Sequence, residues 1–370
     1  MSRSARSDAL HGKVQCFANG EAAASFAALA LEIAEFQEEF SAGFARLVRR
    51  KGTLTAVEDI PGVPCDAFRL TRVAVHPESE DSARFATSGT TGSSRGVHAF
   101  RTLHTYRTLA VKFGGAALLS SSKPRRVVAL APRLDDPPSS SLGYMMALFM
   151  TEFEPHSSLD ARAPQRWLID EQGVNVAELE RAARSANDAG EELVILATSF
   201  ALVTLLDALA GRTLTAPKHT VVMQTGGFKG KSREVPAHEL RLAVARAFGI
   251  GAARVVSEYG MTELTSQLYE ATLPGSELQA ERRGDPGIYF EPPWLRVVPV
   301  DPVTLEPVAA GEVGIARIVD LANVDSAIAI QTQDRVRRAG GGIELLGRAP
   351  GATPRGCSLA VEEYLQAQST

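Results

Sequence analysis

Short apolar runs alternate with helical patterns through the middle of the chain, and this alternation constrains the fold more than any other feature. The runs at residues 127–131 and 193–197 are too short for helices and are rich in Val, Leu and Ala. Such alternation is typical of parallel sheets covered by helices, so we predict an α/β fold. Strands are expected at residues 127–131, 193–197, 219–223 and 254–257, and helices at residues 142–153, 175–188, 200–209 and 240–248.

The two ends of the chain have a different character. Apolar residues recur every three or four positions over residues 21–50, which predicts an amphipathic helix that stops at Gly52. Extended pieces are expected around residues 68–75. After Pro286, short apolar runs joined by turns predict an antiparallel or barrel-like β-rich subdomain, with strands at residues 288–300, 313–319 and 326–332.

These patterns divide the chain into three expected parts. Residues 1–285 form an α/β core that includes the helical segment 21–50, and residues 286–346 form the β-rich subdomain. Residues 347–370 form a short tail that carries Cys357 and is too short to be a domain.

Charge and cysteine content argue against several classes of partner and site. The net charge is −4, so nothing favours general binding to nucleic acid or to an anionic membrane. Cys16, Cys65 and Cys357 lie far apart without metal-ligand spacing or a plausible disulfide framework, which fits a reducing compartment. The first ten residues lack the apolar run of a signal peptide, and no stretch approaches the ~18 apolar residues of a membrane span. We therefore expect a cytoplasmic protein.

The densest cluster of small and hydroxyl residues is T-S-G-T-T-G-S-S-R-G at residues 87–96. Glycines let backbone N–H groups approach an anion closely, and the hydroxyls add donors without bulk. Arg95 supplies a positive charge that suits a triphosphate. The segment is not a Walker loop, because no G-x-x-x-x-G-K-[ST] occurs in the chain. Composition alone leaves a flexible surface loop as an equal alternative.

A second motif, S-E-Y-G-M-T-E at residues 257–263, directly follows a predicted strand. Open α/β sheets place ligands at the carboxyl ends of their strands. There Tyr259 is suited to stack on a nucleobase and Glu263 to hold Mg²⁺ against phosphates. Taken alone, the motif also fits the capped start of a helix.

Together the two motifs resemble those of the adenylate-forming superfamily, which includes acyl-CoA synthetases, adenylation domains and luciferases. Its phosphate loop reads [ST]-S-G-[TS]-[TS]-G-x-P-K-G, and its later motif Y-G-x-T-E matches residues 259–263 at every fixed position. Thr332-Gln333-Asp334 stands where that superfamily has T-G-D, and Gly347-Arg348 stands at its hinge.

The resemblance implies the fold of the large domain of that superfamily and a set of ligands for ATP and Mg²⁺. Tyr259 would stack on adenine, Asp334 would bind the ribose and Glu263 would ligate Mg²⁺. Arg95 would act on the phosphates, and His98 and His104, which follow the loop, are expected to be surface or satisfied core positions. The other implied nucleotide-binding residues are Thr87, Ser88, Gly89, Thr90, Thr91, Gly92, Gly227, Gly260, Thr262 and Arg348.

The sequence also departs from the pattern of the superfamily. Ser94 replaces the usual Pro, Arg95 replaces Lys, and Gln333 replaces Gly. The sequence ends about 20 residues after Arg348, where the superfamily has a further domain of roughly 100 residues that carries a catalytic lysine. We therefore expect another cation to substitute, with Arg335, Lys229 and Lys231 as candidates.

The C-terminal region narrows the resemblance to the acyl-protein synthetases of bacterial bioluminescence (LuxE type). The similar segments are residues 347–350 and 354–359, together with Ser141–Tyr144 and residues 225–230. The resemblance implies that a carboxylic acid, a fatty acid in that family, is converted to its acyl-AMP. Cys357 would then take the acyl group as a thioester, with an acyl-accepting protein or a reductase as partner. The alternative for Cys357 is a cysteine without a role.

Two other readings stay open at this stage. The chain also fits an acid–CoA ligase of the phenylacetate type, in which a soluble thiol accepts the acyl group. The unusual Ser94 and Arg95 leave room for a degenerate nucleotide- or acyl-binding protein without catalysis. As an acyl-protein synthetase or as an acid–CoA ligase, the protein would be a ligase that forms carbon–sulfur bonds.

Overall fold

The computed structural model describes residues 1–21, 24–87, 95–226, 235–282, 284–349 and 355–366, and for residues 355–357 and 366 it describes only the backbone. Four parallel strands form the middle of its main sheet. They are β4 (Arg125–Pro132), β7 (Glu192–Thr198), β8 (Val221–Thr225) and β9 (Val255–Tyr259), paired in that order. These are the four strands that the short apolar runs predict.

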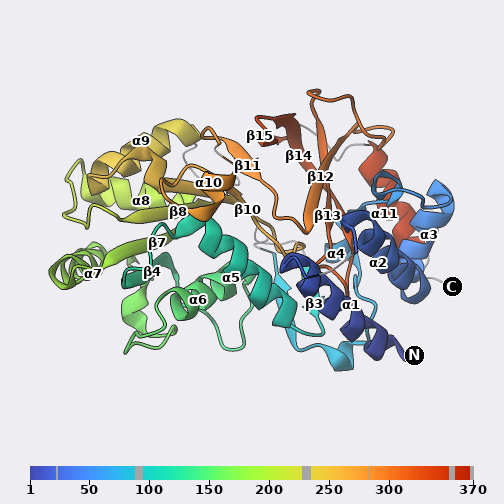
Figure 1. The fold of residues 1–370 in the computed structure, drawn as a ribbon, viewed down its shortest axis with the longest axis horizontal. Coiled ribbons are helices and arrows are strands. Elements are labelled where there is room, and N and C mark those ends of the chain that lie inside the picture. The colour runs from blue at the N-terminus through green and yellow to red at the C-terminus, as the bar shows by residue number, and fades with distance from the viewer. Residues whose placement is uncertain (22–23, 88–94, 227–234, 283, 350–354, 367–370) are drawn as a thin grey trace.

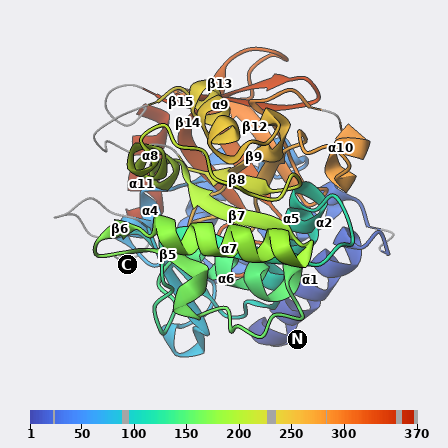
Figure 2. The same ribbon diagram turned by 90° about the vertical axis from the view of Figure 1, so that its left-hand side faces the viewer.

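Helices cover both faces of the parallel strands. Three of them, α7 (Val176–Ala189), α8 (Ser199–Leu209) and α9 (Ala237–Phe248), lie on the face turned to the viewer in Figure 2. On the opposite face lie α5 (His104–Leu118) and α6 (Ser141–Phe153). Side chains alternate between two apolar clusters, so that Val222 joins the cluster of α7–α9 and Met223 the cluster of α5 and α6. The predicted α/β architecture is confirmed.

Antiparallel strands extend the same sheet on one side. The predicted β-rich region contains β11 (Ile288–Phe290), β12 (Leu295–Val300), β13 (Gly314–Asp320), β14 (Ala329–Ala339) and β15 (Gly342–Arg348). A strand that the sequence did not reveal, β10 (Leu268–Glu270), pairs with both β9 and β11 and so joins this region to the parallel strands. The short helix α10 (Glu277–Arg282) lies between β10 and β11 along the chain.

The main sheet has thirteen strands in the described part of the chain (Figure 1). Beyond β4 its other edge is formed by β5 (Trp167–Asp170) and β6 (Gly173–Val174), and β1 (Val63–Pro64) pairs in parallel with β14. The other twelve strands follow the order β12-β13-β14-β15-β11-β10-β9-β8-β7-β4-β5-β6. A separate hairpin of β2 (Ala83–Ala86) and β3 (Val97–Phe100) flanks the small-residue loop.

The N-terminal helices differ from the prediction. The single helix expected over residues 21–50 is two helices, α2 (Phe26–Phe40) and α3 (Ala42–Lys51), because Ser41 has an extended backbone and caps α3. The hydroxyl of Ser41 accepts a hydrogen bond from Phe44 N at 3.3 Å, as an N-cap does. Gly52 ends α3 with a positive φ of 102°, as predicted.

Two further elements also correct the sequence-based picture. A helix α1 (Arg3–Ala18) precedes α2, and the segment expected to be extended around residues 68–75 begins with a short helix, α4 (Ala67–Leu70). The buried stripe of α1 includes Ser7 and His11, and these polar residues obscure its apolar period.

The C-terminal segment forms a helix, α11 (Arg355–Gln366), that packs on α3 (Figure 1). Among the described residues, no helix is both long enough and apolar enough to cross a membrane.

Candidate active site

The small-residue loop starts and ends at a pinched neck between β2 and β3. Thr87 N donates to Gly96 O at 2.9 Å, and Gly96 N donates to Thr87 Oγ1 at 3.0 Å. A Cβ on residue 96 would lie 3.3 Å from Thr87 Cγ2, which favours glycine at this close approach. Arg95 is exposed beside the neck. The hairpin therefore holds both ends of the loop together, whereas Ser88, Gly89, Thr90, Thr91, Gly92 and Ser94 lie outside the described residues.

The second motif overlaps the carboxyl end of β9 and continues beyond it. A Cβ at Gly260 would lie 2.4 Å from Oε1 of Glu258, so a larger residue there would displace that carboxylate. Burial raises the pKa of Glu258 to about 7, against the opposing effect of a hydrogen bond from the hydroxyl of Thr225. The second residue of the motif is thus a buried carboxyl group, to which the sequence analysis gave no role.

His98 on β3 ties the motif to the phosphate-loop hairpin. Its Nδ1 lies 2.8 Å from Thr262 O, and its Nε2 lies 2.8 Å from Ser326 Oγ. Because a carbonyl oxygen only accepts, Nδ1 carries the proton and Nε2 accepts from the serine hydroxyl. Burial lowers the pKa of His98 to about 4. His98 is the satisfied core residue that we expected, while His104 is exposed at the start of α5.

Glu263 is buried at the end of the motif, with only 7% of its surface exposed. Its backbone oxygen accepts from Asn323 Nδ2 at 3.0 Å, which fixes the turn that carries it. Within the described ranges, no three His, Cys, Asp or Glu side chains gather to hold a metal ion by themselves. A single carboxylate that shares Mg²⁺ with substrate phosphates is the usual arrangement for this ion, so Glu263 fits the predicted role.

Three residues predicted to bind nucleotide meet beside β9. Tyr259 Oη donates to Asp334 Oδ2 at 2.8 Å, and Arg348 Nε lies 3.4 Å from Asp334 Oδ1. Asp334 and Arg348 face each other across β14 and β15, and Asp334 N also donates to Thr332 Oγ1 at 3.1 Å. Burial raises the pKa of Tyr259 well above its usual value, and the nearby carboxylate of Asp334 adds to this effect. The tyrosine is therefore a neutral donor to Asp334.

Cys65, which no motif of the sequence includes, borders this group. Its N–H donates to Gln331 O at 3.2 Å, at the end of β1. Burial raises the pKa of the Cys65 thiol well above its usual value, and the carboxylates of Glu263 and Asp334 raise it further. The thiol is therefore protonated and lies near both carboxylates. No sequence signal marked it, because its neighbours are about 200 or more positions away along the chain.

Other predicted residues are placed only in part. Gly227, Lys229 and Lys231 lie outside the described residues, although Ser199 Oγ donates to Gly226 O at 2.6 Å and so fixes the chain just before them. Arg335 is exposed on β14. Cys357 lies in the first turn of α11, where the structure describes only the backbone.

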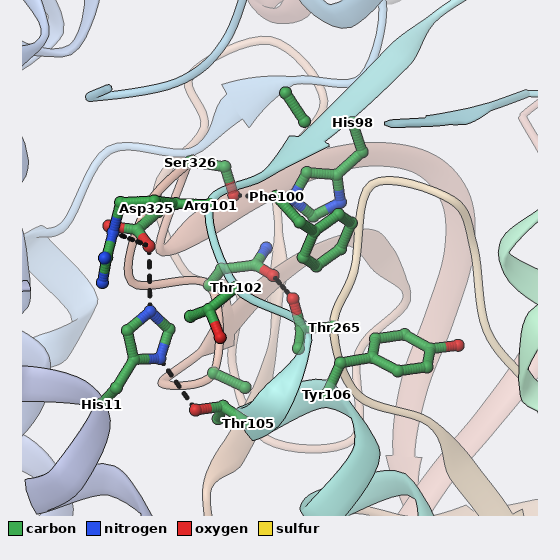
Figure 3. A pocket seen from close by; sticks show the side chains of 13 residues that line it. His11, His98, Phe100, Arg101, Thr102, Thr105, Tyr106, Thr265, Asp325 and Ser326 are labelled. Carbon is green, nitrogen blue, oxygen red and sulfur yellow. Dashed lines mark hydrogen bonds and ion pairs between the residues drawn. The ribbon is translucent and has the colours of Figure 1, made fainter. Parts of the chain in front are cut away.

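Behind the site, a polar network connects α1 to the turn that carries Ser326 (Figure 3). His11 lies between Asp325 and Thr105: its Nε2 is 2.9 Å from Asp325 Oδ2 and its Nδ1 is 2.8 Å from Thr105 Oγ1. Arg101 Nε donates to the same carboxylate at 3.2 Å, and the hydroxyl of Ser7 donates to its other oxygen. The network borders a small cavity of about 10 Å³, which is close to the volume that one water requires.

Known proteins share sequence features and a fold with this chain. The family described as "Acyl-protein synthetase, LuxE" matches residues 47–366 of the chain. The chain belongs to this family. As a member of the LuxE acyl-protein synthetase family, it is an enzyme of the adenylate-forming ligase class, which activates acyl groups with ATP.

Solved structures show the same fold at low sequence identity. 2-Hydroxyisobutyryl-CoA ligase, in the postadenylation state with 2-HIB-AMP, aligns with a TM-score of 0.58 and 14% identity, covering 94% of this chain and 69% of that chain. Its open conformation with 2-HIB-AMP and CoA gives a TM-score of 0.56 and 14% identity, covering 88% of this chain and 74% of that chain. The predicted adenylate-forming fold of this LuxE family member is therefore confirmed.

ATP-bound MatB from Rhodopseudomonas palustris aligns over a smaller part, with a TM-score of 0.47, 18% identity and coverage of 74% of this chain and 49% of that chain. The chain of the LuxE family member thus spans about half the length of MatB. No curated protein sequence matches the chain.

Proposed function

We propose that the protein uses Mg-ATP to convert a carboxylic acid to its acyl-AMP and then transfers the acyl group to its own Cys357. The observation that carries the first step is the meeting of Tyr259, Asp334 and Arg348 at the end of β9. Asp334 and Arg348 lie on the consecutive strands β14 and β15, whereas Tyr259 on β9 precedes Asp334 by 75 positions. They are the residues that the resemblance assigns to the nucleoside.

In this proposal the described residues bind and orient the nucleotide. Asp334 accepts from the ribose hydroxyls, and the Tyr259 ring packs against adenine while its hydroxyl holds the Asp334 carboxylate. The Thr87–Gly96 neck presents the phosphate loop, and Arg95 brings a cation to the phosphates. Mg²⁺, when bound, would neutralise phosphate charge with Glu263 as its protein ligand.

The adenylation step is a displacement at phosphorus. A carboxylate oxygen of the acid forms a bond to the α-phosphorus of ATP, the bond from that phosphorus to the bridging oxygen breaks, and pyrophosphate leaves. The protein contributes position and positive charge rather than covalent chemistry. Arg95, Arg348 and Arg335 are the described cations that we assign to this charge, with Arg348 nearest to Asp334.

Transfer would follow at Cys357. The thiolate sulfur forms a bond to the acyl carbon, the bond from that carbon to the phosphate oxygen breaks, and AMP leaves; the thiol proton passes to solvent. Family membership supports a fatty acid as the substrate and a further protein, such as a reductase, as the eventual acceptor of the acyl group.

The second candidate is an acid–CoA ligase, in which CoA replaces Cys357 as the acceptor. The fold shared with 2-hydroxyisobutyryl-CoA ligase favours it as the alternative. The two functions share the adenylation step and differ only in the thiol. CoA dependence of thioester formation therefore separates them.

Pyrophosphate release with a panel of carboxylic acids, from acetate to long-chain fatty acids, tests the first step. The wild-type protein should release pyrophosphate only with ATP, Mg²⁺ and a suitable acid. Glu263→Gln keeps the size of the side chain but removes its charge, and we expect a loss on the order of 100-fold because Mg²⁺ loses its carboxylate ligand.

Glu58→Gln, at an exposed position in the segment before β1, serves as a matched control and should release pyrophosphate at the wild-type rate. Equal rates for Glu263→Gln and the wild-type protein would contradict the assigned role of Glu263. ATP binding without pyrophosphate release across the whole panel would instead support a degenerate nucleotide-binding protein.

A further inference from the structure

The helix that carries Cys357 packs on α3 through a buried aromatic side chain. Tyr364 on α11 is only 2% exposed, and its hydroxyl lies 3.4 Å from Ser41 Oγ. Its ring lies directly over Gly43, where a Cβ would be 2.7 Å from the ring carbons Cε2 and Cζ. An ion pair between Arg46 and Glu363, at 3.3 Å, borders the contact. The close contact between the Tyr364 ring and α3 therefore depends on the absence of a side chain at Gly43.

The helix α11 also packs against the segment that borders the candidate active site. Besides α3, α11 packs on β1 and α4. The two residues between β1 and α4 are Cys65 and Asp66, and Gln333 Nε2 donates to Asp66 Oδ2 at 3.4 Å. Cys65 in turn lies near the carboxylates of Glu263 and Asp334. The segment between the two elements that contact α11 is thus hydrogen-bonded to β14, the strand that carries Asp334.

The helical repeat of α11 places Cys357 on the same side of the helix as Tyr364. Tyr364 follows Cys357 by seven positions, which is close to two full turns, so both positions lie on one stripe of α11. Ala360, on the same stripe, is buried at 5% exposure. At the other end, Ala349 N donates to Gln333 O at 3.0 Å, and the six steps from Ala349 to Arg355 span at most about 21 Å. Cys357 therefore lies along the chain between two contacts, the hydrogen bond of Ala349 with Gln333 and the packing of Tyr364 on Gly43.

We infer that Tyr364 and Gly43 form an anchor that positions Cys357 for acyl transfer. This inference rests on the proposed function, because it assigns the anchor to the second half-reaction only. Neither Tyr364 nor Gly43 is among the residues that we assign to ATP, so the anchor acts through the placement of α11. Loss of the anchor should slow the formation of the Cys357 thioester and leave adenylation intact, since a displaced nucleophile loses its oriented approach to the acyl carbon.

Gly43→Ala tests the anchor with little disturbance of α3. Alanine is the best helix former, so the substitution favours α3 while its methyl group displaces the Tyr364 ring. Gly12→Ala is the matched control, because Gly12 also lies within a helix and a Cβ there meets nothing within 4 Å. Tyr364→Phe keeps the ring and Tyr364→Ala removes it.

For each variant, pyrophosphate release and self-acylation are measured with the same acid, and hydrogen exchange is measured over residues 355–366. We expect Gly43→Ala and Tyr364→Ala to slow self-acylation by about tenfold or more, with pyrophosphate release close to wild type. Exchange should rise in α11 for these two variants. Gly12→Ala and Tyr364→Phe should behave like the wild-type protein in all three measurements.

Three results would overturn the anchor. The first is wild-type self-acylation by Gly43→Ala with increased exchange in α11. The second is unchanged exchange in α11 for Tyr364→Ala. The third is an equal loss of pyrophosphate release and self-acylation, which would indicate a structural role only. A wild-type protein that releases pyrophosphate but forms no Cys357 adduct would instead refute the proposed acyl acceptor.

Discussion

His98 is a single side chain on which two separate parts of the candidate active site depend. It donates to the backbone oxygen of Thr262 and accepts from Ser326, so its neutral form with the proton on Nδ1 satisfies both contacts. A protonated ring could still donate to the oxygen of Ser326, but it would place a positive charge inside a buried site. Burial therefore requires a neutral His98 for full stability.

This requirement predicts a pH dependence of stability. The pKa of His98 is lowered from 6.5 to about 4 by burial, to which His76 adds. Below pH 6.5 the unfolded chain binds a proton that the folded protein does not, so this contribution to stability is full above pH 6.5 and is lost as the pH falls towards 4. The loss should reach about 3 kcal/mol.

Urea unfolding between pH 4.5 and 7.5 measures this contribution by comparison with His98→Gln. The glutamine keeps a donor and an acceptor but does not titrate, so its free energy of unfolding should depend less steeply on pH in this window. Parallel curves for the two proteins would refute the assignment to His98. Other titrating groups are common to both proteins and cancel in the comparison.

The helix α1 belongs to neither motif, yet its side chains contact the turn that lies beside His98. Its Ser7 and His11 both donate to Asp325, and Arg101 on the segment after β3 donates to the same carboxylate. Burial acts to raise the pKa of Asp325, but the bonds from His11 and Ser7 and the charge of Arg101 outweigh it and lower the pKa. The carboxylate is therefore charged and central to the docking of α1.

Asp325→Asn should accordingly destabilise the protein by about 3 kcal/mol, because it leaves Arg101 without a buried counter-charge. Asp8→Asn removes the other, exposed partner of Arg101 and should cost less than about 1 kcal/mol. Urea unfolding measures both free energies, and hydrogen exchange over α1 should rise only for Asp325→Asn. Similar losses for the two variants would contradict the assigned role of the network.

Some elements were predictable from the sequence and others were not, for physical reasons. The strands β4, β7, β8 and β9 were predictable because both of their faces are buried, which requires continuous apolar runs. The division of α2 from α3 was not, because Ser41 interrupts the backbone without interrupting the apolar period. The helix α1 was hidden because its buried face docks through polar side chains.

Some residues of the candidate site were likewise predictable from the sequence and others were not. Tyr259, Asp334 and Arg348 were found through motifs, and the structure brings them into contact. Their individual roles toward adenine, ribose and phosphate stay predictions. His98 and Cys65 were not found as part of the site, because their contacts join positions that no local pattern relates.

In the molecule as a whole, the order of the sheet assembles the site. The strand β10 pairs with β9 on one side and β11 on the other, and β11 pairs with β15, so the end of β9 comes to lie beside the β14–β15 hairpin (Figure 1). The parallel pairing of β1 with β14 then brings the Cys65 segment to the same place, and α11 packs on β1 from outside. The candidate active site and the helix that carries Cys357 thus belong to one connected set of elements.

The central claim is that one chain both activates the acid and accepts it. Intact-mass spectrometry of the purified protein tests this most directly, after incubation with Mg-ATP and one carboxylic acid at a time in the absence of CoA. We predict an added mass of one acyl group that hydroxylamine removes and that Cys357→Ala lacks, although this variant still releases pyrophosphate. An adduct that persists in Cys357→Ala, or pyrophosphate release with no adduct on the wild-type protein, would contradict the claim.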